Sequence, residues 1–172
     1  RLRASGSPVR IVRTMSATTF EDRENHRIYV EWTELLTPAL GERMYVHHDL
    51  YEKTHTHRLK HGEDRCQAWP SPPYRAPLWP LLTQMTGARR FLEVGCGLGY
   101  TAALMADAGG ADSHVDTIES DPGHAGLAER ELGRKGLSQR VKVLRGRAEE
   151  ILPGLNERYD VLFVDGGGPE VD

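Results

Sequence analysis

Three glycines, Gly95, Gly97 and Gly99, lie close together in the segment FLEVGCGLGY at 91–100. Glycine at a turn from a strand to a helix lets the backbone bend sharply and come close to a ligand at the helix N-terminus. The dinucleotide fingerprint G-x-G-x-x-G has its third glycine one residue later, where this chain has Tyr100. The spacing therefore disfavours a pyrophosphate cradle, and it leaves a small-ligand loop or a plain strand-to-helix turn.

Two acidic residues distinguish this glycine loop from a plain turn. Glu93 comes two residues before Gly95, and a carboxylate there attracts an ammonium group, directly or through water. Glu119 follows a little more than twenty residues later, near the spacing of the acid that accepts hydrogen bonds from a ribose. Together they favour a ligand that combines a nucleoside with an amino-acid tail.

Alternating strands and helices must position these residues. Apolar runs predict strands at 90–94, 115–119, 141–144 and 159–164, with helices at 100–108, 121–136 and 148–152. Asp121 and Pro122 open the second helix and Gly136 closes it, and Glu131 with Lys135 is expected to form an ion pair on its outer face. Such repetition predicts right-handed crossovers and an α/β fold with a Rossmann-like, doubly wound parallel sheet.

The chain before this repeat divides into two parts by composition. Residues 1–20 carry four arginines and no acid, which predicts a disordered leader, with a transit peptide as the alternative. Residues 21–86 form a helical and proline-rich extension, with an amphipathic helix around 28–40, a linker at 66–80 and a short helix at 78–85. Residues 87–172 are the predicted ligand-binding domain. Trp69, Tyr74 and Trp79 either cover the ligand or pin the linker to that domain.

Composition excludes several classes of protein. The 172 residues include 22 Lys and Arg against 25 Asp and Glu, so a basic surface for nucleic acid is not expected. No apolar run is long enough to span a membrane, and Cys66 and Cys96 are too few for a disulfide framework. We therefore expect a cytoplasmic protein without nucleic-acid or membrane partners. The amphipathic helix offers a surface for a homodimer.

With these motifs, residues 87–165 resemble the class I S-adenosylmethionine-dependent methyltransferases. The likeness is carried by EVGCGLG at 93–99, IESD at 118–121 and YDVLFVD at 159–165. It implies that the glycine loop lines the methionine moiety, that Glu93 places its amino group, that Glu119 holds the ribose, and that Ala148 lies near adenine. The full set of cofactor-binding residues implied by the resemblance is Glu93, Gly95, Cys96, Gly97, Gly99, Tyr100, Glu119, Ser120, Ala148 and Asp165.

Within that superfamily, the chain is most similar to the catechol and caffeoyl-CoA type of O-methyltransferase. The helix start at Gly99-Tyr100-Thr101 and the strand ending in Phe163-Val164-Asp165 carry this likeness. It implies that Asp165 is a catalytic residue that binds a divalent cation such as Mg²⁺ and thereby lowers the pKa of an acceptor hydroxyl. A complete fold of this class has seven strands and four are predicted here, so we expect an incomplete fold and a C-terminally truncated chain.

The predicted function is therefore methyl transfer from S-adenosylmethionine to the oxygen of a small, for example aromatic, acceptor. The alternative is a truncated or degenerate cofactor-binding module without turnover, and a further one is a different acceptor, such as a protein carboxylate. Five histidines at 47–61 match no standard zinc pattern, so a solvated helix or loop is favoured there. Cys96 is expected to pack within the loop rather than to act as a nucleophile.

Overall fold

The computed structural model describes residues 47–62, 65–71 and 78–166. The leader expected at 1–20, the helix expected around 28–40 and Tyr74 lie outside these residues. None of the helices in the described part of the chain is long and apolar enough to cross a membrane. The elements in chain order are α3 (His48–His61), α4 (Leu78–Thr86), β1 (Arg90–Val94), α5 (Tyr100–Gly109), β2 (His114–Glu119), α6 (Pro122–Arg134), β3 (Val141–Arg145), α7 (Ala148–Ile151), the 3-10 turn η2 (Leu152–Gly154) and β4 (Val161–Val164).

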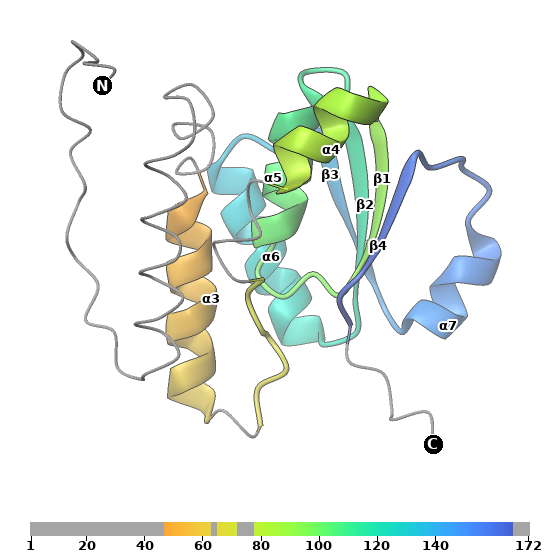
Figure 1. Ribbon diagram of the computed structural model, residues 1–172. Helices are drawn as coiled ribbons and strands as arrows, with labels where there is room; N and C mark the ends of the chain where they lie inside the picture. Colours follow the sequence, from red (N-terminus) through yellow and green to blue (C-terminus); the bar gives the residue numbers. More distant parts are fainter. Residues whose placement is uncertain (1–46, 63–64, 72–77, 167–172) are drawn as a thin grey trace, which may run out of the picture.

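The four described strands form one parallel sheet in the order β3-β2-β1-β4. β1 lies at the centre of the fold, with Phe91 opposite both Val115 of β2 and Val161 of β4. Helices α5 and α6 lie on one side of the sheet and α7 on the other (Figure 1). The predicted α/β, doubly wound architecture is therefore confirmed: β1, β2 and β3 follow one another toward one edge, and the chain then crosses back to place β4 parallel to β1 on its other side.

Capping residues set the bounds of α6. The Asp121 carboxylate accepts a hydrogen bond from the His124 backbone N–H at 2.8 Å, and Pro122 occupies the first turn. At the other end Gly136 has φ of +70°, and the Leu137 N–H returns to the Leu132 carbonyl. These signals fix where α6 begins and ends and where its first turn points.

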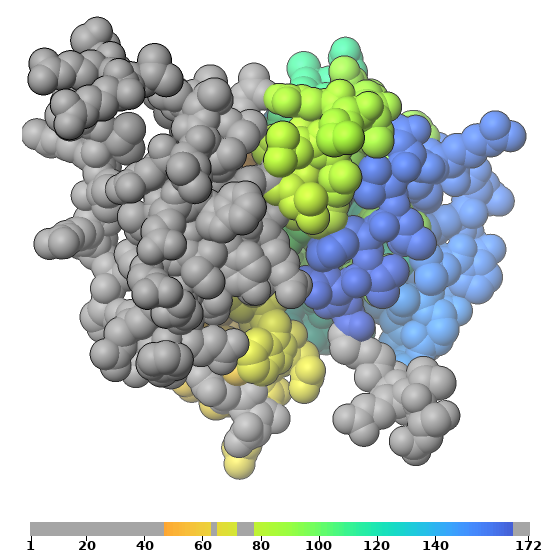
Figure 2. Space-filling view, viewed as in Figure 1, coloured from red at the N-terminus to blue at the C-terminus, as the bar shows by residue number. Residues whose placement is uncertain are grey.

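One hydrophobic core joins the helices before the sheet to the sheet itself. Phe91 of β1 and Met105 of α5 are buried there together with Leu50 of α3. Trp79 of α4 packs edge-on against Phe163 of β4, with ring centroids 4.6 Å apart. In the space-filling view α4 and β4 accordingly lie next to each other at the surface (Figure 2). Trp79 therefore belongs to the core and not to a ligand cover.

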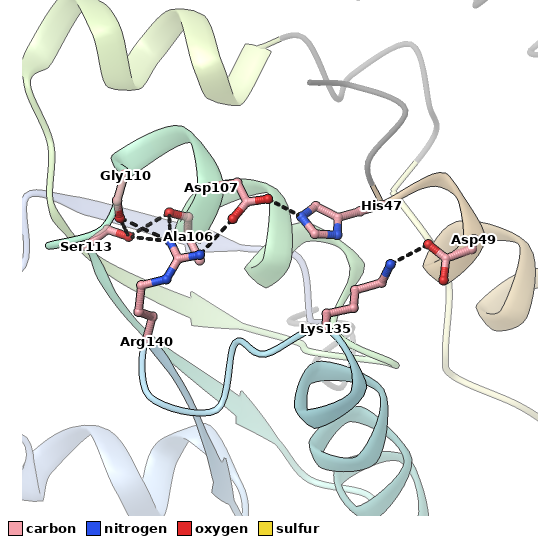
Figure 3. Close-up of polar contacts among 8 residues, drawn as sticks. All are labelled: His47, Asp49, Ala106, Asp107, Gly110, Ser113, Lys135 and Arg140. Atoms are coloured by element: carbon pink, nitrogen blue, oxygen red, sulfur yellow. Dashed lines mark hydrogen bonds and ion pairs between the residues drawn. The ribbon is translucent and has the colours of Figure 1, made fainter. Parts of the chain in front are cut away.

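The prediction that Glu131 and Lys135 form an ion pair is wrong. Glu131 is only 6% exposed, and it bonds to Lys53 of α3 and to Arg134. The Lys135 ammonium instead donates to the Asp49 carboxylate at 2.5 Å (Figure 3). The cause is the tertiary packing of α3 beside this part of α6. Because α3 presents charges of both signs, ion pairs between the two helices replace the local pair.

His47 is also buried rather than solvated, with 2% of its surface exposed. Its Nε2 lies 2.7 Å from the Asp107 carboxylate, whose other oxygen accepts from Arg140 at 2.8 Å. Arg140 also donates to the Ala106 carbonyl, so the start of α3, the end of α5 and the turn before β3 are joined (Figure 3). The hydrogen bond from His47, with help from Arg140, holds the pKa of Asp107 below its usual range.

Replacing Asp107 by alanine is expected to destabilise the chain by about 1–3 kcal/mol, because buried His47 loses its partner. Urea unfolding followed by circular dichroism measures this loss. Glu129→Ala serves as the control, since Glu129 pairs with Arg145 on the surface and such pairs contribute only about 0–1 kcal/mol. An Asp107→Ala loss no larger than the control would contradict the role assigned to this cluster.

Candidate functional site

A pocket opens at the carboxyl ends of β1, β2 and β4, where doubly wound sheets bind ligands. Its volume of about 440 Å³ is in the range of small-molecule sites. The lining comes from the glycine loop, the ends of three strands, the turn before α7 and the segment after α3. The lining residues are Gln67, Trp69, Val94, Gly95, Gly97, Ile118, Glu119, Ser120, Gly146, Arg147, Ala148, Glu149, Asp165 and Gly166.

The glycine loop owes its shape to the absence of side chains. Gly95 has φ of +97°, and a Cβ on it would lie 2.8 Å from the backbone oxygen of Asp165. The loop after β1 and the end of β4 therefore approach more closely than any other residue would allow. This contact brings Gly95 and Asp165 together on one wall of the pocket.

Glu119 is held at the pocket edge by two backbone groups. The Gly97 N–H donates to one carboxylate oxygen at 2.8 Å, and the Asp121 N–H donates to the other at 2.9 Å. The side chain is 8% exposed, so it is oriented before any ligand arrives. Since a carboxylate oxygen accepts more than one hydrogen bond, Glu119 retains capacity for donors on a ligand.

Glu93 lies beneath the loop and is 1% exposed. The Thr117 hydroxyl donates to its carboxyl group. Burial raises the pKa of Glu93 to about 8, and the negative charges of Asp165 and Glu119 add to that rise against the opposing effect of Thr117. Glu93 is thus a neutral or proton-sharing group near pH 7 in the ligand-free chain, and a cation placed above it would favour its charged form.

The structure brings six of the ten predicted cofactor-binding residues to the pocket and leaves four outside its lining. The lining residues among them are Gly95, Gly97, Glu119, Ser120, Ala148 and Asp165. The other four are Glu93, Cys96, Gly99 and Tyr100, which are buried around the loop. Burial also raises the pKa of the Cys96 thiol well above its usual value, which agrees with packing and not with nucleophilic chemistry.

The loop after α3 contributes residues that the motifs did not indicate. Gln67 and Trp69 line the pocket, and the Trp69 ring is 60% exposed. The Arg58 guanidinium carbon lies 3.0 Å from the centroid of that ring, and such stacking holds the indole in place. Both predicted roles of Trp69 fit these contacts: its place in the pocket lining suits a ligand cover, and its stacking on Arg58 of α3 anchors the linker.

Acidic groups outnumber basic ones around the pocket. Among the residues that the structure describes, Glu119, Glu149 and Asp165 line it against the one cation Arg147. Arg147 already pairs with Glu149. A concave site with this surplus of carboxylates favours a ligand that carries positive charge.

Comparison with known proteins agrees with this geometry. Residues 92–170 match a family described as a methyltransferase domain. A catechol O-methyltransferase of Niastella koreensis is 35% identical over 101 residues, which is 56% of this chain and 46% of that protein. Two solved structures, each 27% identical, share the fold. One is a putative O-methyltransferase from Klebsiella pneumoniae, with a TM-score of 0.64 and coverage of 81% of this chain and 60% of the other.

The second is the O-methyltransferase TomG from Streptomyces achromogenes in complex with SAM, with a TM-score of 0.62 and coverage of 89% of this chain and 63% of the other. Residues 92–170 are thus similar to a methyltransferase domain, and the described sheet has the fold of these O-methyltransferase structures. The similarity is to the catechol and caffeoyl-CoA type of O-methyltransferase, as the sequence motifs predicted. The chain spans less than half the length of the Niastella relative.

The buried carboxyl group of Glu93 predicts an unusual pH dependence of stability. A pKa raised from 4.5 to about 8 means that the folded ligand-free chain loses stability as pH rises through this range. Glu93→Gln removes the charge, so its thermal midpoint should exceed that of the parent at pH 8 and approach it at pH 4.5. Parallel midpoints of the two proteins across that range, measured by differential scanning calorimetry, would contradict this assignment.

Proposed function

We propose that this chain is the cofactor-binding part of an S-adenosylmethionine-dependent O-methyltransferase. The observation that carries the proposal is the pocket at the strand ends, where the Gly97 backbone and the Glu119 carboxylate meet. The cofactor has an ammonium group, a sulfonium and a ribose diol, so it needs acidic surroundings and acceptors for hydroxyl groups. The surplus of carboxylates and the fixed position of Glu119 meet these two needs.

Each part of the cofactor has a counterpart in the pocket. Glu119 would accept hydrogen bonds from the ribose hydroxyls while its backbone donors keep it in place. Gly95 and Gly97 would let the methionine part lie against the backbone, above the carboxyl group of Glu93. Ser120 and Ala148, at the ends of the loops after β2 and β3, would flank the adenosine. Trp69 would cover it from the side of the segment after α3.

Bound S-adenosylmethionine supplies a methyl group that is already activated on a sulfonium sulfur. In the transfer, the acceptor oxygen forms a bond to the methyl carbon as the bond to sulfur breaks, and the hydroxyl proton leaves to a base. The protein's part is then to align donor and acceptor and to assist loss of that proton. Asp165, on the pocket wall, is our candidate for the acceptor side, and a small hydroxyl compound is the proposed acceptor.

The described residues alone do not complete a site for Mg²⁺ at Asp165. Mg²⁺ prefers six oxygen ligands, and among the described residues Asp165 belongs to no group of three or more acidic, histidine or cysteine ligands. We therefore assign no step to a cation. That the reaction requires a divalent cation stays a prediction, as do the cytoplasmic location, the homodimer and the lack of nucleic-acid partners.

Changing Glu119 to glutamine is expected to weaken binding of S-adenosylhomocysteine by about 10-fold or more. The amide oxygen of glutamine could accept from only one of the two N–H donors, Gly97 or Asp121, and its NH2 group would face the other. The negative charge that receives the ribose would also be lost. Isothermal titration calorimetry measures the change in affinity. Glu157→Gln is the matched control, because Glu157 is exposed and pairs with Arg90 away from the pocket.

Equal affinities of Glu119→Gln and Glu157→Gln would contradict the assignment of Glu119. Turnover is tested separately, as S-adenosylhomocysteine produced with a panel of catechols and other hydroxyl compounds, with and without a chelator. Tight cofactor binding without product for any acceptor would favour the alternative of a binding module that does not turn over. Activity that persists in the chelator would contradict the metal-assisted form of the reaction.

A further inference from the structure

A second hollow lies next to the first, on the side of α3 and the start of α6. Three potential metal ligands meet there: His57 of α3, Cys66 of the segment after it and His124 of α6. Their ligand atoms all lie within 4.8 Å of one another. In the part of the chain that the structure describes, this is the one such group of three or more histidine, cysteine or acidic side chains.

Local structure delivers each of the three side chains to this point. α3 ends at Gly62, which has φ of +86°, and the Cys66 N–H bonds back to the Gly62 carbonyl, so the chain turns and returns Cys66 toward the helix. On the other side, the Asp121 cap fixes the first turn of α6, where His124 lies. Two separate turns thus place a thiol and an imidazole against the last turns of α3.

The contacts within the cluster are close and largely out of water. Cys66 is 4% exposed and His124 is 8% exposed. Sγ of Cys66 lies 3.5 Å from Nε2 of His124, and the rings of His57 and His124 meet edge-on with centroids 5.1 Å apart. A thiol and an imidazole form only a weak hydrogen bond, so this arrangement leaves polar groups poorly compensated unless a further group joins them.

The geometry is close to that of a tetrahedral transition-metal site. Bonds of about 2.0–2.1 Å to histidine nitrogen and about 2.3 Å to cysteine sulfur place the two ligand atoms roughly 3.5 Å apart around a tetrahedral ion. The separation of Cys66 Sγ and His124 Nε2 already has this value. The other separations are at most 4.8 Å, so binding an ion would require the partly exposed His57 side chain to move closer to the other two.

We propose that His57, Cys66 and His124 bind a divalent transition-metal ion of the zinc type. Imidazole nitrogen and thiolate sulfur are ligands that zinc accepts and that Mg²⁺ and Ca²⁺ do not prefer. His61 lies one helical turn beyond His57, with ring centroids 4.3 Å apart, and it is our candidate for a fourth ligand, although its ligand atoms lie outside the group of three.

The ion would also bear on the methyltransferase pocket. Cys66 precedes Gln67 and Trp69, which line that pocket, and Ala68 lies beside Gly97 of the glycine loop. The two hollows share Gln67, Glu119, Ser120 and Arg147 in their linings. A metal held by Cys66 would fix this segment over the loop, so we assign the ion a structural role and not a catalytic one.

The test is a titration of the whole chain with Zn²⁺ and, in parallel, with Co²⁺, whose spectrum reports its ligands. We expect one tightly bound ion per chain and a thiolate-to-cobalt charge-transfer band, because Cys66 binds through sulfur. Cys66→Ser should abolish the band, and His124→Gln should weaken metal affinity by about 10-fold or more. His55→Gln, on the same helix but outside the cluster, and Cys96→Ser, the other thiol, are matched controls that should keep both band and affinity.

Three results would overturn the proposal. The first is that no ion binds stoichiometrically, and the second is that the parent shows no charge-transfer band. The third is an equal loss of metal affinity in the control variants, which would mean adventitious binding by the histidine-rich helix. Circular dichroism checks that each variant folds. Should buried Cys66→Ser not fold, His57→Gln on the accessible side carries the same comparison. Zn²⁺ should also raise the thermal midpoint of the parent and not of His57→Gln, and this readout does not depend on enzyme activity.

Discussion

The Glu119 carboxylate connects the parts of this molecule on which any function depends. It accepts the Gly97 N–H from the loop after β1 and the Asp121 N–H from the loop after β2. Through Gly97 it shapes the floor of the pocket, and through Asp121 it adjoins the cap that starts α6 and orients His124. One side chain at a strand end thus ties together the glycine loop, the second crossover and the cluster of metal ligands.

Around that connection the sheet supplies rigid support. β1 lies between β2 and β4, and the close approach of Gly95 to the backbone of Asp165 makes their carboxyl ends a continuous surface. Burial beneath this surface raises the pKa of Glu93 to about 8 in the ligand-free chain, and the nearby negative charges of Asp165 and Glu119 add to that rise. Stability without the ligand is therefore reduced at the place where a cationic ligand would be held.

Local sequence signals were enough to predict most of the sheet and its helices. β1 begins and ends where its apolar run does, and α6 begins at Pro122 and ends close to its glycine signal. These elements follow from short-range chemistry, namely apolar runs, caps and the freedom of glycine, so a single sequence reveals them. Given the strand order that the structure shows, the face occupied by each helix then follows from the right-handed crossover rule.

What the sequence did not reveal depends on packing between distant segments. Glu131 and Lys135 have the spacing of a local ion pair, yet α3 lies beside them and each pairs across the interface. The histidines at 47–61 carry no standard zinc spacing, because two of the three proposed ligands, Cys66 and His124, come from a later turn and from another helix. A hint was present in the spacing of His57 and His61, four residues apart on one helix face, with Cys66 five residues later.

The central claim is that the pocket binds the cofactor, and calorimetric titration of the chain with S-adenosylhomocysteine tests this claim most directly. Gly97→Arg serves as the blocked form, because Gly97 lines the pocket and an arginine side chain there would fill the space beside the backbone. We expect saturable binding of one ligand per chain by the parent and no binding by Gly97→Arg. Absence of binding by a folded parent chain, or equal binding by both proteins, would contradict it.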